Sequence, residues 1–286
     1  MRERGTWLPT MGTAVAIIWG LTFLSTKVAV REMGPMSLAL SRFIIAVLTL
    51  LPIVALTKTS LRIEKKDLPR LAIAGFLGIT LYFLFENNGI MRLSASESSI
   101  IVGTIPVLTL LIEMFIYRRK TRPVVAIGIV LSFLGVAGIV AKSETVKSSP
   151  AGYFFMVGAA LVWVVYTFQT RPLGLKYPLL SVTFWQIFFG MLGCIPFAIA
   201  EGQNFAAVSL PIWLNVAFLG VIASAFGYWF YVVVLDRLGA SRAAVFINLI
   251  PVVSIVASFF LLGERLSPLQ LVGGAAAIAG VYLATV

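Results

Sequence analysis

The sequence predicts an all-α integral membrane protein: ten transmembrane helices form two five-helix repeats of inverted topology, with both termini in the cytoplasm. Three observations support this fold class. Of the 286 residues, 60% are apolar and only 12% are charged, and the mean hydropathy is +1.01. A soluble domain carries about 25% charged residues. Apolar segments of about 20 residues, the length needed to cross a bilayer, follow one another along the chain. The second half also repeats residues of the first half.

Each predicted span is bounded by charged residues, proline or glycine, and most begin at or near a proline. Proline is tolerated there because the first-turn N–H has no helical partner. The first apolar stretch is too long for a signal peptide and lacks a small-residue cleavage pattern, so it is interpreted as a span. In chain order the ten spans are 8–30, 35–56, 68–87, 94–117, 123–141, 150–170, 178–200, 210–235, 240–262 and 268–285.

The distribution of basic residues predicts the orientation. With the N-terminus inside, the cytoplasmic segments hold 15 Lys and Arg residues, including Arg2 and Arg4, and the outer segments hold 6. Cytoplasmic loops carry the excess of Lys and Arg. We therefore expect a multi-pass protein of the cytoplasmic membrane with both termini inside. The net charge of +11 is explained by these loops, so no nucleic-acid partner is expected.

Residues 1–143 and 149–286 are predicted to be two copies of one unit. Residues 95–136 match residues 240–281 at a shift of 145, and the identical positions include Pro106 and Pro251. Trp19 matches Trp163 at a shift of 144. A unit of five spans must enter the membrane from the opposite side when it is repeated. Inverted repeats are typical of secondary transporters, in which two halves move about a site near the midplane.

Several residues resemble one known family. The segment 261–266 (LLGERL), followed by Pro268, Gly273 and Gly280, resembles the end of a repeat of the EamA family, in the drug/metabolite transporter superfamily. Three other segments are similar to this family as well: Trp19-Gly20, Arg42-Phe43 and the run from Ala95-Ser96 to Pro106. The first copy departs from the pattern, because Arg119 stands where Glu264 predicts a glutamate. The resemblance implies a ten-span exporter of amino acids and other small metabolites, often proton-coupled.

Other classes of function have less support. The chain has no histidine and one cysteine, so it cannot form an internal disulfide, and the commonest metal ligand is missing. No catalytic pair or cluster lies within the spans and no Walker A motif is present. We expect no enzyme activity, no metal and no cofactor. The alternatives to amino-acid export are an exporter of cationic amines or drugs, and a lipid scramblase or flippase-like protein.

Substrate-binding candidates are polar or aromatic residues within the spans, where ionisable groups are costly and often functional. Arg42 and Glu86 can contact a charged substrate. Together with Glu97 and Lys27 they can also meet near the outer mouth, either as a gate or proton site or as a structural ion pair that locks the second, third and fourth spans. Asn248 follows the carbonyl that Pro251 frees. The aromatic candidates can form a cavity wall, although Trp and Tyr also favour the membrane interface. The full set is Trp19, Phe23, Arg42, Tyr82, Glu86, Trp163, Tyr166, Tyr228 and Asn248.

Without histidine, proton coupling has to use carboxylates, and the candidates are Glu86, Glu97 and Glu113. Glu97 lies near a helix N-terminus, where a carboxylate also suits the helix dipole. Glu113 can instead extend towards the basic residues 118–122. Mid-span Pro106 and Pro251 remove a helical N–H, so they are expected to kink their helices. The kinks are either hinges for alternating access or bends that pack statically. The small-residue faces of the fifth and tenth spans predict either scaffold packing or a homodimer contact.

Overall fold

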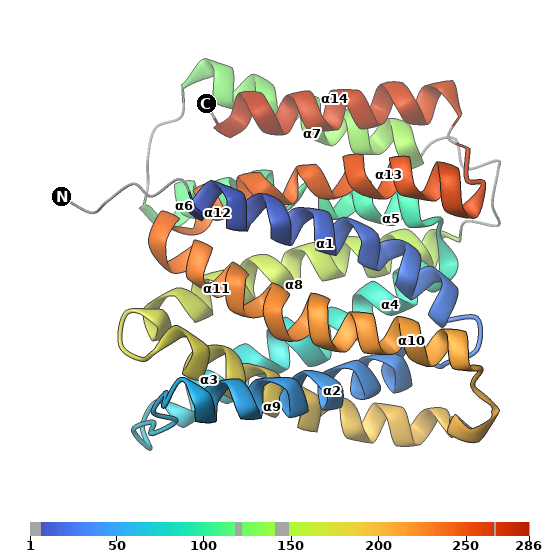
Figure 1. Cartoon of the computed structure of the whole chain (residues 1–286). Coiled ribbons are helices and arrows are strands. Elements are labelled where there is room, and N and C mark those ends of the chain that lie inside the picture. The colour runs from blue at the N-terminus through green and yellow to red at the C-terminus, as the bar shows by residue number, and fades with distance from the viewer. Residues whose placement is uncertain (1–6, 118–121, 141–148, 266, 286) are drawn as a thin grey trace.

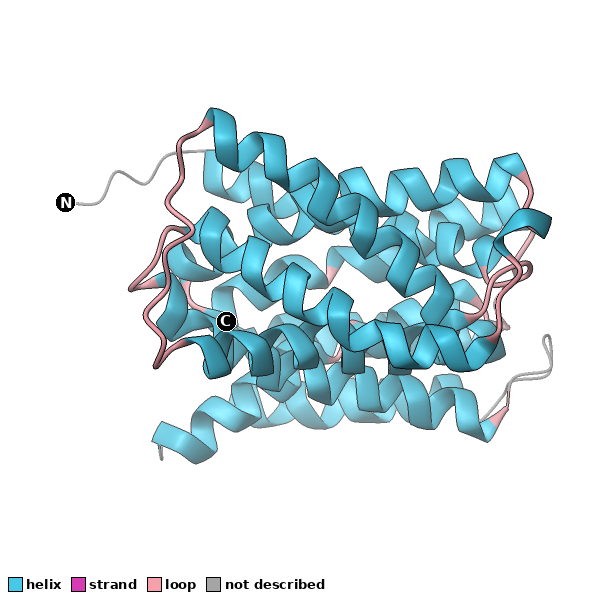
Figure 2. Cartoon of the chain, turned by 90° about the horizontal axis from the view of Figure 1, so that it is seen from below, coloured by secondary structure: helices cyan, strands magenta, loops and turns pink. Residues whose placement is uncertain are grey.

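The computed structural model describes residues 7–117, 122–140, 149–265 and 267–285. Within these ranges the chain is helical and contains no strand, and its connections gather at the two ends of one bundle (Figure 2). The first residue of α1 and the last turn of α14 lie at the same end of the bundle (Figure 1). Some residues named in the sequence analysis lie outside the described ranges. They are Arg2, Arg4, Arg119 and most of the predicted boundary between the repeats, residues 143–149.

The first half contains α1 (Trp7–Ala29), α2 (Pro35–Leu56), α3 (Leu68–Gly75), η1 (Phe76–Leu81), α4 (Tyr82–Arg92), α5 (Ala95–Val102), α6 (Ile105–Tyr117) and α7 (Pro123–Val140). The second half contains α8 (Pro150–Gly174), α9 (Leu179–Glu201), η2 (Phe205–Ala207), α10 (Leu210–Phe218), η3 (Leu219–Phe226), α11 (Gly227–Leu238), α12 (Ala240–Ile247), α13 (Leu249–Leu262) and α14 (Pro268–Thr285).

Eight segments of the described chain are long and apolar enough to cross a membrane, by length and composition alone. They match eight of the predicted spans. The remaining two predicted spans correspond to α7 and α14, in which the described residues provide shorter apolar stretches, Pro123–Gly135 and Leu271–Gly280. The chain is therefore a multi-pass membrane protein, and the count of ten, the inverted topology and the cytoplasmic termini remain predictions.

Two spans contain a π-helical turn at matching places. In the third span η1 joins α3 to α4, and in the eighth span η3 joins α10 to α11. Both turns begin within the repeated Phe-Leu-Gly sequence, at Phe76 and at Leu219. A π-helical turn shifts the backbone hydrogen-bonding register and is frequent at functional sites. These turns were not predicted, because the apolar sequence through them continues without a break.

Two other spans are interrupted close to their central prolines. The fourth is divided between α5 and α6 at Gly103 and Thr104, and the ninth between α12 and α13 at Asn248. The kinks predicted from Pro106 and Pro251 are thus confirmed, and each break lies two or three residues before its proline. The breaks face each other, because a Cβ atom on Gly103 would lie only 2.8 Å from Cγ of Pro251.

Helices α7 and α14 lie side by side at one edge of the bundle, opposite α2 and α9 (Figure 1). Their small residues allow the two backbones to approach closely. A Cβ on Gly135 would lie 2.4 Å from the Ala277 nitrogen, and one on Gly280 would lie 2.3 Å from the Ser132 nitrogen. These glycine faces are used within the chain, which supports the scaffold interpretation. A homodimer through these helices remains a prediction and would have to use their other faces.

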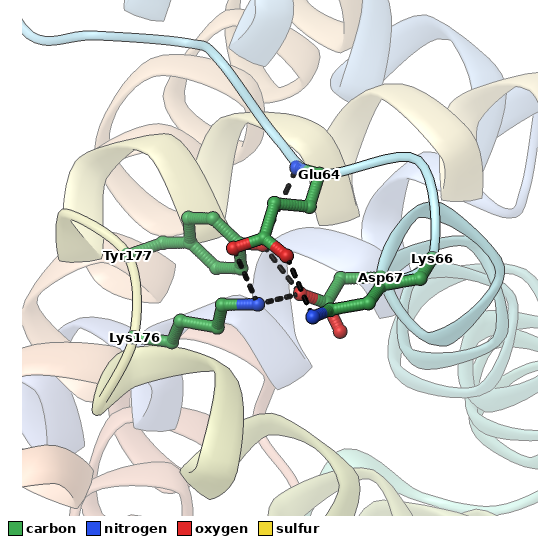
Figure 3. Close-up of polar contacts among 5 residues, drawn as sticks. All are labelled: Glu64, Lys66, Asp67, Lys176 and Tyr177. Carbon is green, nitrogen blue, oxygen red and sulfur yellow. Dashed lines mark hydrogen bonds and ion pairs between the residues drawn. The ribbon is translucent and has the colours of Figure 1, made fainter.

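A polar cluster joins the two halves at one end of the bundle (Figure 3). Lys176, after α8, forms ion pairs with Glu64 at 2.8 Å and with Asp67, both in the loop between α2 and α3. Tyr177 donates a hydrogen bond to the same Asp67 carboxylate. The Lys176 ammonium group lowers the pKa of both carboxyl groups below their usual values. These contacts join the loop between α2 and α3 to the segment between α8 and α9, at the end predicted to be cytoplasmic.

Candidate functional site

A central cavity lies between the two halves. Its walls combine both π-helical spans with both interrupted spans. It is lined by Trp19, Thr22, Phe23, Arg42, Tyr82, Phe83, Glu86, Val102, Ile105, Trp163, Tyr228, Ile247 and Ile250. Seven of the nine predicted substrate-binding residues are therefore brought together in one place, and the two exceptions are Tyr166 and Asn248.

Arg42 extends from α2 and is 2% exposed. Its Nε donates a hydrogen bond to Oγ of Ser224 at 2.9 Å, and its Nη2 makes a longer one to the Leu219 carbonyl at 3.5 Å. Both acceptors belong to η3, in the other half of the chain. The guanidinium carbon lies 4.6 Å from the centre of the Phe83 ring, a distance that permits a cation–π interaction. The arginine is thus positioned by η3 and α4.

Glu86 lies one helical turn after Tyr82 on α4, and its Oε1 accepts a 2.7 Å hydrogen bond from the Tyr82 hydroxyl. In the described part of the chain, Arg42 and Glu86 form no ion pair within 4.0 Å. Of the ion pairs considered from the sequence, the one between Arg42 and Glu86 is therefore absent from this conformation. One cavity holds a cation and an anion that do not neutralise each other by direct contact.

Aromatic side chains from both halves meet at the base of this cavity. Trp19 and Trp163, which occupy matching positions of the two repeats, are in edge-to-face contact with ring centres 5.3 Å apart. Tyr82 lies 4.9 Å from Trp163, and Tyr228 lies 5.7 Å from Trp19. Such aromatic pairs add stability beyond the area they bury. The aromatic wall predicted from midspan residues is present.

The π-helical turns orient two of these rings. Nε1 of Trp19 donates to the Ala223 carbonyl of η3 at 3.1 Å. The hydroxyl of Tyr228 donates to the Gly78 carbonyl of η1 at 2.8 Å. Each hydrogen bond crosses from one half of the chain to the other. The altered carbonyl register of a π-helix thus provides acceptors for cavity side chains.

Two substrate-binding predictions fall outside the cavity. Tyr166 is buried behind it, where its hydroxyl donates to Oε1 of Gln186 at 3.2 Å and its ring packs against Gly78. Asn248 lies at the α12–α13 break, between the cavity residues Ile247 and Ile250, and its Oδ1 accepts no hydrogen bond in the structure. Its predicted contact with substrate remains a prediction.

Two coupling candidates also lie elsewhere. Glu97 forms a capping box with Ser94 at the start of α5, and its Oε1 accepts a 3.0 Å hydrogen bond from Tyr153. Its environment is that of a helix cap, which the helix-dipole alternative anticipated. Glu113 is partly buried in the last turns of α6 and does not line the cavity. Of the three carboxylates, Glu86 is the one that faces the cavity.

The sequence interpretation missed part of the lining. Thr22 lies three residues after Trp19 and Phe83 lies three residues before Glu86, so their helical faces could have indicated them. Val102, Ile105, Ile247 and Ile250 flank the two helix breaks. The matching prolines were the signal for these four, because a broken helix inside a membrane normally faces protein or a cavity. No group of three or more potential metal ligands occurs among the described residues.

Comparisons with known proteins agree with this architecture. The model of the EamA-like transporter family matches the chain twice, over residues 7–141 and 150–286. An uncharacterized transporter of Archaeoglobus fulgidus is 30% identical, over 93% of this chain and 94% of its own. A protein of Streptantibioticus cattleyicolor, named a probable terminal-alkyne amino-acid exporter, is 30% identical over 93% of this chain and 89% of its own.

More distant proteins show the same extent of similarity. A Salmonella typhimurium protein named a probable amino-acid metabolite efflux pump is 24% identical, over 94% of this chain and 91% of its own. A solved crystal structure shares the fold with a TM-score of 0.69 at 20% identity, covering 97% of this chain and 96% of that one. With two family matches that together span nearly all of its residues, this chain belongs to the EamA-like transporter family.

Proposed function

We propose that the chain is a secondary transporter that exports amino acids or closely related metabolites across the cytoplasmic membrane by alternating access, with the central cavity as its substrate site. The observation that carries this proposal is the separation of Arg42 and Glu86 within one aromatic-walled cavity. The names of two relatives, an amino-acid exporter and an amino-acid metabolite efflux pump, support the same class of substrate.

A zwitterionic amino acid matches the two charges. Its carboxylate accepts hydrogen bonds from the guanidinium N–H groups of Arg42 that η3 does not use. Its ammonium group binds the Glu86 carboxylate, with the rings of Tyr82 and Trp163 beside it. Isolated charges are expensive to bury and become acceptable when each has a partner. A cationic amine satisfies Glu86 but adds a second positive charge near Arg42, so the zwitterion is the better fit.

Proton coupling follows from competition for one carboxylate. A proton and the substrate ammonium group neutralise Glu86 in mutually exclusive ways, which links proton entry to substrate release. Pro106 and Pro251 lie just beyond the two facing breaks, where a change in helix angle alters access to the cavity with little change in the helices themselves. The lipid-translocation alternative has less support, because the names of two relatives point to amino-acid export.

Counterflow in proteoliposomes tests this function because it requires no driving gradient. The panel consists of single labelled amino acids, polyamines and quaternary amines. We expect saturable exchange of amino acids and its loss in Arg42→Gln and Glu86→Gln, with the exposed Arg242→Gln as a matched control that keeps exchange. Exchange of polyamines or quaternary amines alone would overturn the zwitterion assignment. Lipid translocation without solute exchange would favour the scramblase alternative.

Coupling is tested separately by pH-driven flux. Glu86, Glu97 and Glu113 are each replaced by glutamine, and flux is compared with counterflow in the same preparation. A coupling carboxylate is identified by a variant that still exchanges substrate but no longer responds to the pH gradient. Glu86→Gln is expected to impair both activities, because Glu86 also binds substrate. A normal pH response in all three variants would refute carboxylate coupling.

A further inference from the structure

A second, smaller cavity adjoins the central one. It is lined by apolar residues of α1, α11, α12 and α13, together with Tyr231. The lining residues that it does not share are Gly12, Val15, Ala16, Tyr231, Val234, Ala243 and Phe246. Trp19, Ile247 and Ile250 line both cavities. The two spaces are thus neighbours.

The second cavity lies towards one particular end of the bundle. Gly12 is near the start of α1, Ala243 is near the start of α12, and Val234 is near the end of α11. These positions are all displaced from the central cavity towards the end where α1 begins and α11 meets α12. The basic-residue distribution predicts that this end is cytoplasmic, which is the side from which an exporter takes its substrate.

The opposite end is closed by polar contacts around the turn between α4 and α5. Nζ of Lys27, in α1, donates hydrogen bonds to the Leu93 carbonyl and to that of Ile90 at 2.8 Å. Glu264, after α13, accepts hydrogen bonds from the backbone nitrogens of Ala95 and Ser96 at 3.0 and 3.1 Å. This turn is therefore held by elements from both halves. The Lys176 cluster joins the two halves at the other end, but none of its residues lines the second cavity. The apolar second cavity therefore offers an approach to the central cavity that crosses neither set of polar contacts.

Trp19 is placed to control that approach. Its indole N–H is held by the Ala223 carbonyl at 3.1 Å, and its ring lies 5.2 Å from Tyr231 and 5.3 Å from Trp163. Gly227 provides the room it occupies, since a Cβ there would lie 2.7 Å from the indole nitrogen. Rotation of the indole breaks one hydrogen bond and connects the two cavities.

We propose that the second cavity is the route by which substrate enters the central site from the end where α1 begins, and that Trp19 is the gate between them. This inference rests on the proposed function only in taking the central cavity as the substrate site. The route suits a molecule that leads with an apolar group, because the groups facing it are aliphatic or aromatic and the Tyr231 hydroxyl already hydrogen-bonds Thr167.

Cysteine accessibility tests the gate. Cys194 is the single cysteine and is buried, so Cys194→Ala provides the background. Ala243→Cys reports on the second cavity and Ile105→Cys on the central one. The probe is a membrane-impermeant cationic methanethiosulfonate reagent, added to one side of sealed vesicles at a time. Trp19→Ala and Trp19→Phe are the test variants, and Trp229→Ala, which removes an indole from α11 that lines neither cavity, is the matched control.

We expect the reagent to modify Ala243→Cys from the end where α1 begins. Trp19→Ala should accelerate modification of Ile105→Cys from that same side by about tenfold, the factor expected when one hydrogen bond and its ring contacts no longer hold the gate closed. Trp19→Phe, which keeps a ring but loses the N–H, should give a smaller increase, and Trp229→Ala should give none.

Equal Ile105→Cys rates with and without Trp19→Ala would overturn the gate. Faster modification of Ala243→Cys from the opposite side would overturn the route. A thermal melt of each variant confirms that the altered rates come from folded protein. Labelling does not depend on which substrate is carried, so a chain that exchanges no amino acid yet shows the Trp19 effect would refute the proposed substrate and leave the gate in place.

Discussion

Removing the carboxylate of Glu264 should destabilise the contact between the two halves of the chain. Glu264 follows α13 and accepts three hydrogen bonds at the start of α5: from the Ala95 nitrogen at 3.0 Å, the Ser96 nitrogen at 3.1 Å and the Ser96 hydroxyl at 2.8 Å. It therefore caps a helix whose contacting residue, Ser96, lies 168 positions earlier in the chain. The Glu-Arg pair at 264–265 is part of the segment that resembles the family pattern.

The size of the effect follows from the number and kind of bonds lost. Loss of an N-cap acceptor costs about 0.5–2 kcal/mol, and a carboxylate near a helix N-terminus adds about 0.3–1 kcal/mol. Because Glu264 is partly exposed, water replaces some of the lost bonds, and we expect about 2 kcal/mol for Glu264→Ala. Glu264→Gln keeps one acceptor oxygen and should lose about half as much. At roughly 2–4 °C per kcal/mol, the alanine variant should melt about 4–8 °C lower.

The measurement is thermal unfolding of the purified protein in detergent, followed by tryptophan fluorescence. The neighbouring exposed residue provides the matched control, since Arg265→Ala removes a charge from the same loop without removing a cap. Glu264→Ala should melt below Glu264→Gln, and Glu264→Gln below Arg265→Ala. If Glu264→Ala and Arg265→Ala melt together, the cross-repeat cap does not stabilise the fold and the reasoning is refuted.

Three further outcomes are expected. Gly280→Ala should lower the melting temperature, because its Cβ would lie 2.3 Å from a backbone nitrogen of α7. Gly274→Ala on the same helix is the control and should melt like the unaltered protein, because its Cβ meets an ordinary 3.5 Å contact. Equal melting of the two variants would contradict the close packing of α7 and α14. The two carboxylates paired with Lys176 have lowered pKa values, so their contribution to stability is present above their ordinary pKa values near 4 and is lost as the pH falls through the lowered values. Lys176→Met should therefore flatten the loss of thermal stability in acid, and an unchanged pH profile would show that the cluster does not contribute. Pro251→Ala should slow turnover more than it weakens substrate binding, as measured by the counterflow rate and its half-saturation, and unchanged turnover would remove the hinge assignment.

Much of the candidate site could be predicted from the sequence, because its residues are unusual for their position. A charged or indole-bearing side chain in the middle of an apolar span is a local feature, and Trp19, Arg42, Glu86 and Trp163 were identified in this way and lie around one cavity. The helix breaks were also predictable, because a proline removes a helical N–H wherever it occurs in a span.

Other features were readable from the sequence and were missed. Ser94 and Glu97 have the three-residue spacing of a capping box, which predicts a helix start more strongly than a coupling role. The π-helical turns had a weaker signal, the Phe-Leu-Gly match between the halves. That match indicated a shared backbone shape without saying which shape it was.

The sequence by itself determined the spans and the positions of the interrupted helices, because apolar length and proline chemistry act over one helix at a time. Only the tertiary structure decided which polar groups meet. It directed the Arg42 guanidinium to the Ser224 hydroxyl, away from Glu86, and the Glu264 carboxylate to the backbone nitrogen of Ala95. Both hydrogen bonds join elements far apart in the chain. It also showed that the glycine faces of α7 and α14 pack against each other. A pattern along one helix identifies an unusual face, but the partner of that face is set by how the other helices pack around it.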